Sequence, residues 1–567
     1  MRLYHSRYRL SPVQRLRWVS RVLPKTPKVC QCWLAGIVLV AAVILGSCTP
    51  PQDSQSLISV SISADGGESS LELPTGSTVQ AALSAAGLSL GSLDRIDPPL
   101  YSVLVDGARV KLIRVKEEFE VEQVTIPFEQ QVLRNESMPE GQTRLVQMGV
   151  NGIQEITYRR VFEDDEQVSN SPVKSVVVQE AMSEILMVGS QAPFSTFPIP
   201  GRLAYLLAGN AWVMEGSTGN RRPIVTTGDL DGRIFSMSPD GKWLLLTRRS
   251  SETEDINELW AAEIGDDNLS DRLLVDLGVS NIIHYAEWRP GSTYTIAYST
   301  VEPRASAPGW QANNDLNLIR LSESGRVRPL DVELETNMGG NYGWWGMTFA
   351  WAPDGSGMAY ARPDSIGLVV LGGNSLIPLM DVTTLQTRGD WAWVPALSWG
   401  PDGMVLFTVD HVALPGSASP EESPLFDLTA IPLVGGNPVS LASQAGMFSY
   451  PLPSPVQPRV NGENAYQVAY LQSIFPTQSE ASRYRLAVMD RDGSNRRVLF
   501  PAEDLPGINP LNGWGAWSPE PLDGSQGFSL AVIYQDNLWM VDVESGEARQ
   551  VTGDDLINRV DWKLVIE

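Results

Sequence analysis

The sequence predicts a mainly β protein whose largest part, residues 202–567, is a β-propeller. A short phrase recurs through this part: a strand-forming stretch with an aromatic residue or Met, then Pro-Asp-Gly or a shortened form of it. Pro presets the turn, and Asp-Gly supplies a polar cap and a positive φ, so each copy predicts a strand that ends in a tight turn. Copies about 40 to 65 residues apart, with several strand-like segments between them, are typical of propeller blades.

The copies of this phrase predict seven blades. They lie at 235–241, 286–291, 349–355, 397–403, 448–450 (degenerate), 515–519 and 560–562 (shortened). The first six begin blades, whereas strand-like segments at 203–207, 211–214 and 222–225 lack a first strand. We expect the C-terminal strand to complete that blade and to close the ring, which removes free sheet edges. We also expect the Asp of each phrase (Asp240, Asp354 and Asp402) to cap its turn.

The propeller phrase resembles the repeats of the periplasmic Tol-system protein and of the prolyl oligopeptidases. The resemblance covers the whole of 202–567 and implies the fold, not a particular function.

The first 48 residues have the pattern of an export signal. They hold eight Arg and Lys residues and no acid, and the apolar run 33–45 is short for a membrane span but suits the core of a signal peptide. Leu45-Gly46-Ser47-Cys48 resembles the lipobox of bacterial lipoproteins, which implies a lipid on Cys48. The alternative is an uncleaved membrane anchor. Both place the rest of the chain outside the cytoplasm, with residues 49–56 as a polar tether.

Charge and composition disfavour several classes of protein. The net charge is −24 although residues 1–48 are purely basic, so the body is strongly acidic and is not expected to bind nucleic acid. Its three Cys all lie within the first 48 residues, and no two of its three His are close in sequence. We therefore predict no disulfide, no metal site and no cofactor. A Gly-x-Ser-x-Gly elbow and a phosphate-binding glycine loop are also absent from the sequence.

Residues 57–115 predict a small α+β domain. It begins with a hairpin at 59–73, continues with a capped helix at 74–87, and ends with a hairpin at 103–113 around Asp106-Gly107. This order resembles the ubiquitin-like domain of unknown function found in resuscitation-promoting factors.

Residues 116–189 resemble the G-five (G5) domain, an extended β ribbon of bacterial surface proteins that commonly follows this ubiquitin-like unit. The resemblance rests on segments 122–128, 146–152 and 185–189 and on the glycines Gly141, Gly149, Gly152 and Gly189. Asp164-Asp165 replaces the remaining glycine, and Asp also turns readily. The resemblance implies binding to cell-wall polysaccharide or a spacing role, of which we favour the spacer. Residues 190–201 are predicted to link the ribbon to the propeller.

Aromatic residues cluster in the loops that lead into the predicted innermost strands. Such loops meet around the mouth of a propeller's central channel, where Trp and Tyr rings suit stacking against sugars or peptide aromatics. The predicted ligand-binding residues are Tyr342, Trp344, Trp345, Arg388, Asp390, Trp391, Trp393 and Trp514, with Trp310 from a neighbouring loop. The alternative for the Trp residues is packing between blades.

The sequence thus predicts a non-catalytic, lipid-anchored binding or scaffold protein of the cell envelope, whose ribbon holds a propeller away from the membrane. Its expected partner is cell-wall polysaccharide or an envelope protein. One alternative is an extracytoplasmic hydrolase, such as a glycosidase, which needs paired carboxylates. Glu287, Asp315 and Asp561 are the candidates by position. Another alternative is an envelope assembly factor, as the Tol-like repeats suggest.

Overall fold

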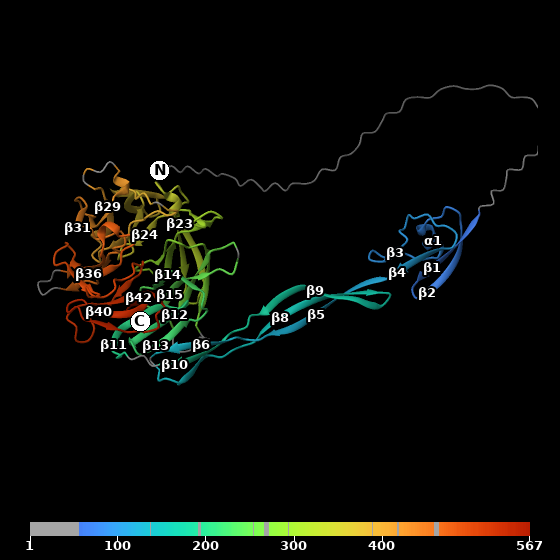
Figure 1. Cartoon of the computed structure of the whole chain (residues 1–567), viewed down its shortest axis with the longest axis horizontal. Helices are drawn as coiled ribbons and strands as arrows, with labels where there is room; N and C mark the ends of the chain where they lie inside the picture. The colour runs from blue at the N-terminus through green and yellow to red at the C-terminus, as the bar shows by residue number, and fades with distance from the viewer. Residues whose placement is uncertain are drawn as a thin grey trace, which may run out of the picture. The chain divides into compact units, whose positions relative to one another are not determined.

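The structure, a computed structural model, describes residues 56–566 except 137, 191–193, 253, 266–271, 293, 388, 415, 417–418 and 459–463 (Figure 1). The predicted export signal, Cys48 and Arg388 lie outside the described residues. Two compact units divide the chain: Met1–Glu118 with Arg160–Ser169, and Phe119–Arg159 with Asn170–Glu567. No helix in the described ranges combines the length and apolar character needed to cross a membrane.

The first unit contains the predicted α+β domain. Its elements are β1 (Leu57–Ala64), β2 (Gly67–Pro74), α1 (Val79–Ala85), β3 (Arg95–Asp97) and β4 (Ala108–Ile113), with the sheet order β2-β1-β4-β3. Alternate residues of β1 and β4, such as Val60 and Val110, are buried against Val79 and Leu83 of α1. Thr78 caps the helix by accepting a hydrogen bond from the Ala81 N–H. The period of two in the strands therefore buries one face of the sheet beneath the helix.

The hairpin predicted at 103–113 does not form. β4 pairs instead with β1 in parallel and with β3 in antiparallel orientation, and Val103 makes only an isolated bridge to Thr78. The Asp106-Gly107 turn is held by β1, because the Ser59 N–H donates to Asp106 Oδ1 at 2.8 Å and the Gly107 N–H donates to Ser59 O. Val103 and Val105 stay exposed, so the apolar strand pattern before the turn was misleading.

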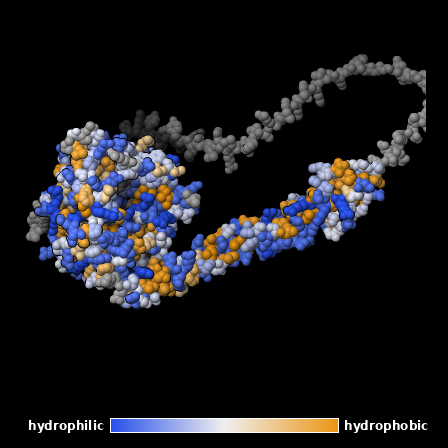
Figure 2. Space-filling model, viewed as in Figure 1, coloured by the Kyte–Doolittle hydropathy of each residue, from blue (hydrophilic) through white to orange (hydrophobic). Residues whose placement is uncertain are grey.

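The ribbon consists of two sheets in succession. The first has the order β5-β8-β9, from β5 (Val115–Ile126), β8 (Gly152–Glu163) and β9 (Glu166–Gln179). The second, here called the terminal lobe, has the order β6-β10-β7, from β6 (Gln130–Asn135), β7 (Thr143–Gln147) and β10 (Glu184–Gly189). Most side chains of β9 are exposed, and Figure 2 shows the apolar ones at the surface.

The ribbon's turns agree with the sequence. Asp164 and Asp165 both have positive φ (48° and 67°), so they form the turn expected from the replaced glycine. A side chain at Gly189 would place its Cβ 2.0 Å from the Pro139 carbonyl oxygen, which explains the need for glycine there.

The propeller consists of seven four-stranded antiparallel sheets within the described part of residues 198–566. From the innermost strand outward they are β42 (Ile557–Lys563), β11 (Pro198–Leu207), β12 (Asn210–Ser217), β13 (Arg221–Val225); β14 (Leu230–Met237), β15 (Trp243–Arg249), β16 (Asn257–Glu263), β17 (Leu274–Ser280); β18 (Ala286–Trp288), β19 (Thr295–Tyr298), β22 (Leu316–Leu321), β23 (Val327–Leu334); β24 (Thr348–Trp351), β25 (Met358–Arg362), β26 (Ser365–Val370), β27 (Ser375–Asp381); β28 (Leu397–Trp399), β29 (Val405–Val412), β30 (Leu425–Pro432), β31 (Val439–Ala442); β32 (Leu452–Pro453), β35 (Gln467–Ser473), β36 (Tyr484–Asp490), β37 (Arg497–Phe500); and β38 (Gly515–Trp517), β39 (Ser529–Tyr534), β40 (Asn537–Asp542), β41 (Ala548–Gln550).

Three short elements lie between these blades' strands. Two are extra hairpins, β20 (Val301–Pro303) with β21 (Trp310–Ala312) and β33 (Gln457–Pro458) with β34 (Asn464–Ala465). The third comprises the 3-10 turns η2 (Gly343–Trp345), η3 (Pro420–Glu422) and η4 (Pro476–Gln478). We number the sheets as blades one to seven in the order given above.

Packing between blades runs through the complete ring. Each of seven buried clusters in the described chain is shared by two consecutive blades, including one between blades seven and one. In β15, Leu244 and Leu246 face blade one, whereas Trp243 and Leu245 face blade three. The C-terminal strand pairs as predicted, with Leu203 opposite Trp562. Alternation along each strand therefore supplies one apolar face to each neighbour.

The repeated phrase acts where it was predicted to act. The carboxylate of Asp354 accepts the Ser356 N–H, and that of Asp402 accepts the Met404 N–H. The indole N–H of Trp288 donates to Ser236 O, that of Trp517 to Leu452 O, and that of Trp562 to Pro200 O. The repeated Trp therefore ties its own innermost strand to the preceding blade.

The degenerate copy at 448–450 does not form an innermost strand. Phe448 and Tyr450 stack on each other, with ring centroids 6.0 Å apart, and pack against the cluster between blades six and seven. The innermost strand of blade six is β32, a few residues further on. Proline-rich sequence around it leaves only a two-residue ladder.

Within the second unit, the terminal lobe of the ribbon is packed onto the propeller. Met187 of β10 is buried in the cluster between blades seven and one, and Leu133 and Met138 pack against that cluster. Arg221 of β13 forms an ion pair with Glu136, at 2.9 Å, and the two side chains are only 5% and 9% exposed. The predicted linker also contributes, because β11 already begins at Pro198.

The hydrogen bonds of this buried pair are satisfied on both sides. Glu136 accepts the Gly553 N–H, while Arg221 donates to Thr218 O and to Val551 O. Asn135, which is buried as well, donates to Arg221 O at 3.3 Å. Buried charges are tolerated when they are paired and fully hydrogen-bonded, so the joint is rigid rather than a hinge.

Breaking this pair should weaken the joint strongly. We expect Arg221→Met to lower the free energy of unfolding by about 3–5 kcal/mol, because it leaves the Glu136 carboxylate buried without its counter-ion. Thermal unfolding of the protein, followed by circular dichroism, measures the effect. The matched control is Arg304→Met, which removes an exposed pair with Glu302 and should cost about 1 kcal/mol or less. Equal losses in the two variants would contradict the rigid joint.

Candidate functional site

The most exposed aromatic cluster of the propeller lies on one glycine-rich loop, residues 338–346, here called the aromatic loop. It leads from β23 into β24 and contains η2. The Asn314 side-chain amide donates to Gly343 O at 2.8 Å, and the Asn341 N–H donates to Asp364 Oδ2 at 2.8 Å. A Cβ on Gly343 would lie 1.8 Å from Met338 O. The loop is therefore held in a compact conformation that requires glycine at this position.

The side chains that this loop presents to solvent are large and apolar. Met338 is 87% exposed, Tyr342 46% and Trp344 40%. Tyr342 adopts a left-handed conformation (φ 56°) immediately before the 3-10 turn. A fixed backbone that displays such rings is suited to binding, because little conformational entropy is lost when a ligand stacks on them.

Trp345 supports the loop from within. Its ring meets that of Trp310 edge to face at 6.1 Å, and Trp310 meets His284 at 4.7 Å. Burial lowers the pKa of His284 to about 4, with Arg233 adding to the shift, so this imidazole is neutral at physiological pH. The structure thus brings Trp310 and Trp345 together as the sequence predicted, mainly as packing partners.

A polar cavity of about 520 Å³, here called the loop cavity, lies beside the aromatic loop and includes Asn341 in its lining. Its other polar groups come from blades four and five and include Arg362, Asp364, Asp381, Thr383 and Glu421. Arg362 Nε and Asp364 Oδ1 form an ion pair at 2.5 Å. Stacking rings next to hydrogen-bonding groups are the combination that carbohydrate sites use.

The other predicted ligand-binding residues do not join this site. Trp393 is 3% exposed and donates to Met447 O, and Trp514 is 2% exposed and donates to Tyr450 O. Both indoles are enclosed between blades, which was the alternative interpretation. Trp391 is half-buried against the cluster of blades four and five, and Asp390 is exposed beside it.

Sequence reasoning missed the polar side of the site. Asn341 follows two glycines and was available as a signal, but Arg362, Asp364, Asp381 and Thr383 lie on other strands and loops. Only the packing of blades four and five brings them beside residue 341.

Two of the candidate catalytic carboxylates bridge neighbouring innermost strands. Asp561 Oδ2 of β42 accepts the Met237 N–H of β14 at 2.7 Å, and Glu287 of β18 accepts the Trp351 N–H of β24. Since an innermost strand has a free edge, these acids satisfy N–H groups that the blade itself leaves unpaired. Asp315 is 7% exposed and accepts hydrogen bonds from Ser299, Thr300 and Asn317.

Glu287 differs from the other two in its protonation. Burial, partly offset by the Tyr285 hydroxyl, raises the pKa of Glu287 to about 7. A carboxyl group that stays protonated near neutral pH can serve as a general acid, as the hydrolase alternative requires. Within the described ranges, no group of three His, Cys, Asp or Glu residues is arranged to hold a metal ion.

Comparisons with known families agree with the order of the N-terminal domains. Residues 60–100 match the model of the G5-linked ubiquitin-like domain, and residues 117–191 match that of the G5 domain. The resuscitation-promoting factor RpfB of Mycolicibacterium smegmatis is 26% identical over 161 residues, which are 28% of this chain and 44% of RpfB. The chain therefore spans less than half of this relative.

Solved structures are similar to separate parts of the chain. The G5 domain of an IgA1 protease is 21% identical and covers 14% of this chain and 94% of its own, with a TM-score of 0.12. A putative 6-phosphogluconolactonase from Bacteroides fragilis is 11% identical and covers 64% of this chain and 96% of its own, with a TM-score of 0.37. In domain order, the chain thus carries a G5-linked ubiquitin-like domain, a G5 domain and a β-propeller.

Proposed function

We propose that this protein is a non-catalytic binding protein of the bacterial cell envelope, located outside the cytoplasm, whose propeller binds cell-wall polysaccharide through the aromatic loop. The observation that carries the proposal is the rigid glycine-rich backbone that exposes Met338, Tyr342 and Trp344. The loop cavity supplies hydrogen-bonding groups for sugar hydroxyls beside these rings.

The N-terminal domains support the location and the stalk in this proposal. The G5 and G5-linked domains are shared with RpfB, to which the printed name assigns a role in resuscitation, and the sequence before residue 49 has the pattern of an export signal with a lipobox. We propose that Cys48 carries a lipid and that the ribbon acts as a spacer. Its buried joint with the propeller suits a stalk, since a rigid joint holds the head in a constant orientation.

The engagement of the channel acids supports a non-catalytic role. Asp315 and Asp561 already accept several hydrogen bonds from neighbouring strands, which leaves Glu287 without a free second carboxylate of the kind that glycoside hydrolysis needs. We assign these three residues to the architecture of the ring.

Removal of the exposed rings should abolish binding to the wall. We expect Tyr342→Ala/Trp344→Ala to lower the affinity for isolated cell wall by about tenfold or more, because each stacking ring contributes about 1 kcal/mol or more. Sedimentation with purified wall material measures the bound fraction. The control is Phe475→Ala, which removes an exposed ring (62%) from a loop of blade six.

Two outcomes would contradict the proposal. Unchanged sedimentation of the folded double variant would exclude the aromatic loop as the wall contact. If the wild type ignores purified wall but captures one envelope protein, and the double variant loses that capture, the loop binds a protein partner instead of a polysaccharide.

The structural role of Glu287 predicts a pH dependence of stability. Its pKa is higher in the folded than in the unfolded state, so the free energy of unfolding should fall as pH rises from about 4.5 to 7, by about 1–3 kcal/mol. Glu287→Gln should remove this slope while the protein still binds the wall. Unfolding measured at several pH values tests it, with the exposed Glu302→Gln as control. Loss of a hydrolytic activity on wall material in Glu287→Gln would instead favour the hydrolase.

A further inference from the structure

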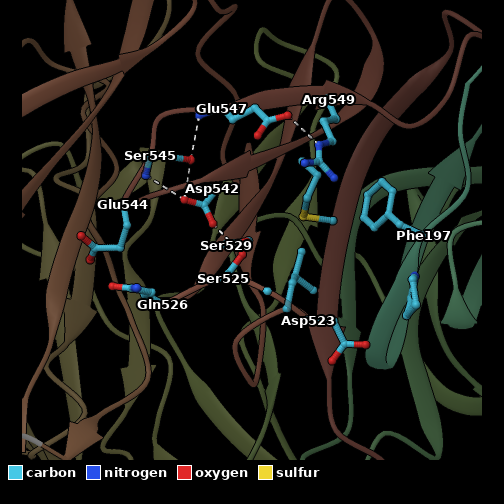
Figure 3. A pocket seen from close by; sticks show the side chains of 14 residues that line it. Phe197, Asp523, Ser525, Gln526, Ser529, Asp542, Glu544, Ser545, Glu547 and Arg549 are labelled. Atoms are coloured by element: carbon cyan, nitrogen blue, oxygen red, sulfur yellow. Dashed lines mark hydrogen bonds and ion pairs between the residues drawn. The ribbon is translucent and has the colours of Figure 1, made fainter.

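A second cavity, of about 600 Å³, lies on the face of blade seven that is turned toward blade one. Near the channel this face is apolar and packed, with Ala531 and Met540 in the cluster of blades seven and one. Farther along the strands it is covered by Phe197, Pro198 and Leu522, which leave a space between themselves and β39–β41. In Figure 3, Phe197 lies on one side of this space, and Asp542, Ser525 and Ser529 lie on the other. We call it the side cavity.

A buried hydroxyl group lines the side cavity without a partner. Ser529 is 0% exposed, and its Oγ has no hydrogen-bond partner among the described residues. It stands opposite Asp542 in the register of β39 and β40. Because buried polar groups are normally paired, an unpaired hydroxyl in a cavity wall indicates a place for a polar ligand atom.

The carboxylate next to this hydroxyl is oriented in advance. Asp542 accepts hydrogen bonds from Ser525 Oγ at 2.6 Å, from the Ser545 N–H at 2.8 Å and from Ser545 Oγ at 2.7 Å. Although burial opposes ionisation, these donors lower the pKa of Asp542 below its ordinary value. The group therefore stays charged at neutral pH.

The side cavity as a whole is negative. Asp523, Asp542, Glu544 and Glu547 line it, against the single cation Arg549, which is paired with Glu547 at 2.9 Å. Arg497 approaches Glu544 only to 3.6 Å. The acidic charge of the whole body adds a long-range attraction for cations.

The remaining walls are apolar. Phe197, Pro198, Leu522 and Met540 line the same space as the carboxylates. Long basic side chains combine an apolar stem with a charged end, and a cation is also attracted to an aromatic face. The cavity is thus complementary to a Lys or Arg side chain and much larger than a bare metal ion requires.

We propose that the side cavity binds a Lys or Arg side chain of a peptide partner, with the charged end at Asp542, Asp523 and Ser529 and the stem against Phe197 and Met540. The outermost strand, β41, borders the cavity through Arg549, and its outer edge pairs with no other strand in the described chain. That edge offers backbone hydrogen bonds to an extended peptide, which favours a peptide over a free amine. The inference does not depend on the polysaccharide site of blade four.

The test compares two fluorescein-labelled peptides, one of alternating Gly and Lys and one in which norleucine replaces Lys, by fluorescence anisotropy with the full chain. We expect the Lys peptide alone to bind. Asp523→Lys should weaken its binding by about tenfold or more, because an attractive group becomes a repulsive one. Asp331→Lys changes the net charge equally at an exposed position of β23 outside the cavity, and it should change the affinity by about twofold or less.

Several results would overturn the proposal. Equal weakening by Asp523→Lys and Asp331→Lys would mean that only the overall negative charge attracts the peptide. Equal binding of the norleucine peptide would mean that the cavity selects apolar chains. Failure of the wild type to bind the Lys peptide at low salt would exclude a basic side chain as the ligand. Circular dichroism of both variants establishes that they are folded.

Discussion

Pairing of the C-terminal strand β42 with β11 is the constraint on which the propeller depends. It joins the last residues of the chain to the first blade, so that the packing between blades continues from the seventh to the first without an open edge. Every blade then has apolar neighbours on both faces, which is why successive residues of strands such as β15 belong to different clusters. The repeated Trp adds a directional contact, since its indole N–H reaches the innermost strand of the preceding blade.

The same junction also carries the ribbon. Blade one contributes Arg221 to the ion pair with Glu136, and the cluster that closes the ring receives Met187 from the terminal lobe. Closure of the propeller and attachment of its stalk therefore share one set of buried contacts. A head attached in this way transmits the position of the ribbon's end to the propeller, which suits a protein that presents a binding surface at a distance from its anchor.

The two sites inferred for the propeller use different chemistry. The aromatic loop offers exposed rings next to neutral and charged hydrogen-bonding groups, which suits sugars. The side cavity has a buried hydroxyl, carboxylates and apolar walls, which suits a basic side chain. The first comes from the junction of blades three and four with blade five, and the second from blade seven. A single propeller can thus hold a wall polymer and a protein at separate places on its surface.

The sequence by itself determined the domain order, the seven-fold repeat and the turns, because these depend on local signals: Pro-Asp-Gly, strand periodicity and the glycines of the ribbon. It also determined that Tyr342 and Trp344 lie in a loop before an innermost strand. It did not distinguish them from Trp393 and Trp514, which occupy equivalent places in other blades but are enclosed by their neighbours. Tertiary structure alone decided that difference, the burial of Glu136 with Arg221, and both cavities. Exposure and pairing of these residues depend on segments distant in sequence, which only the closed ring brings together.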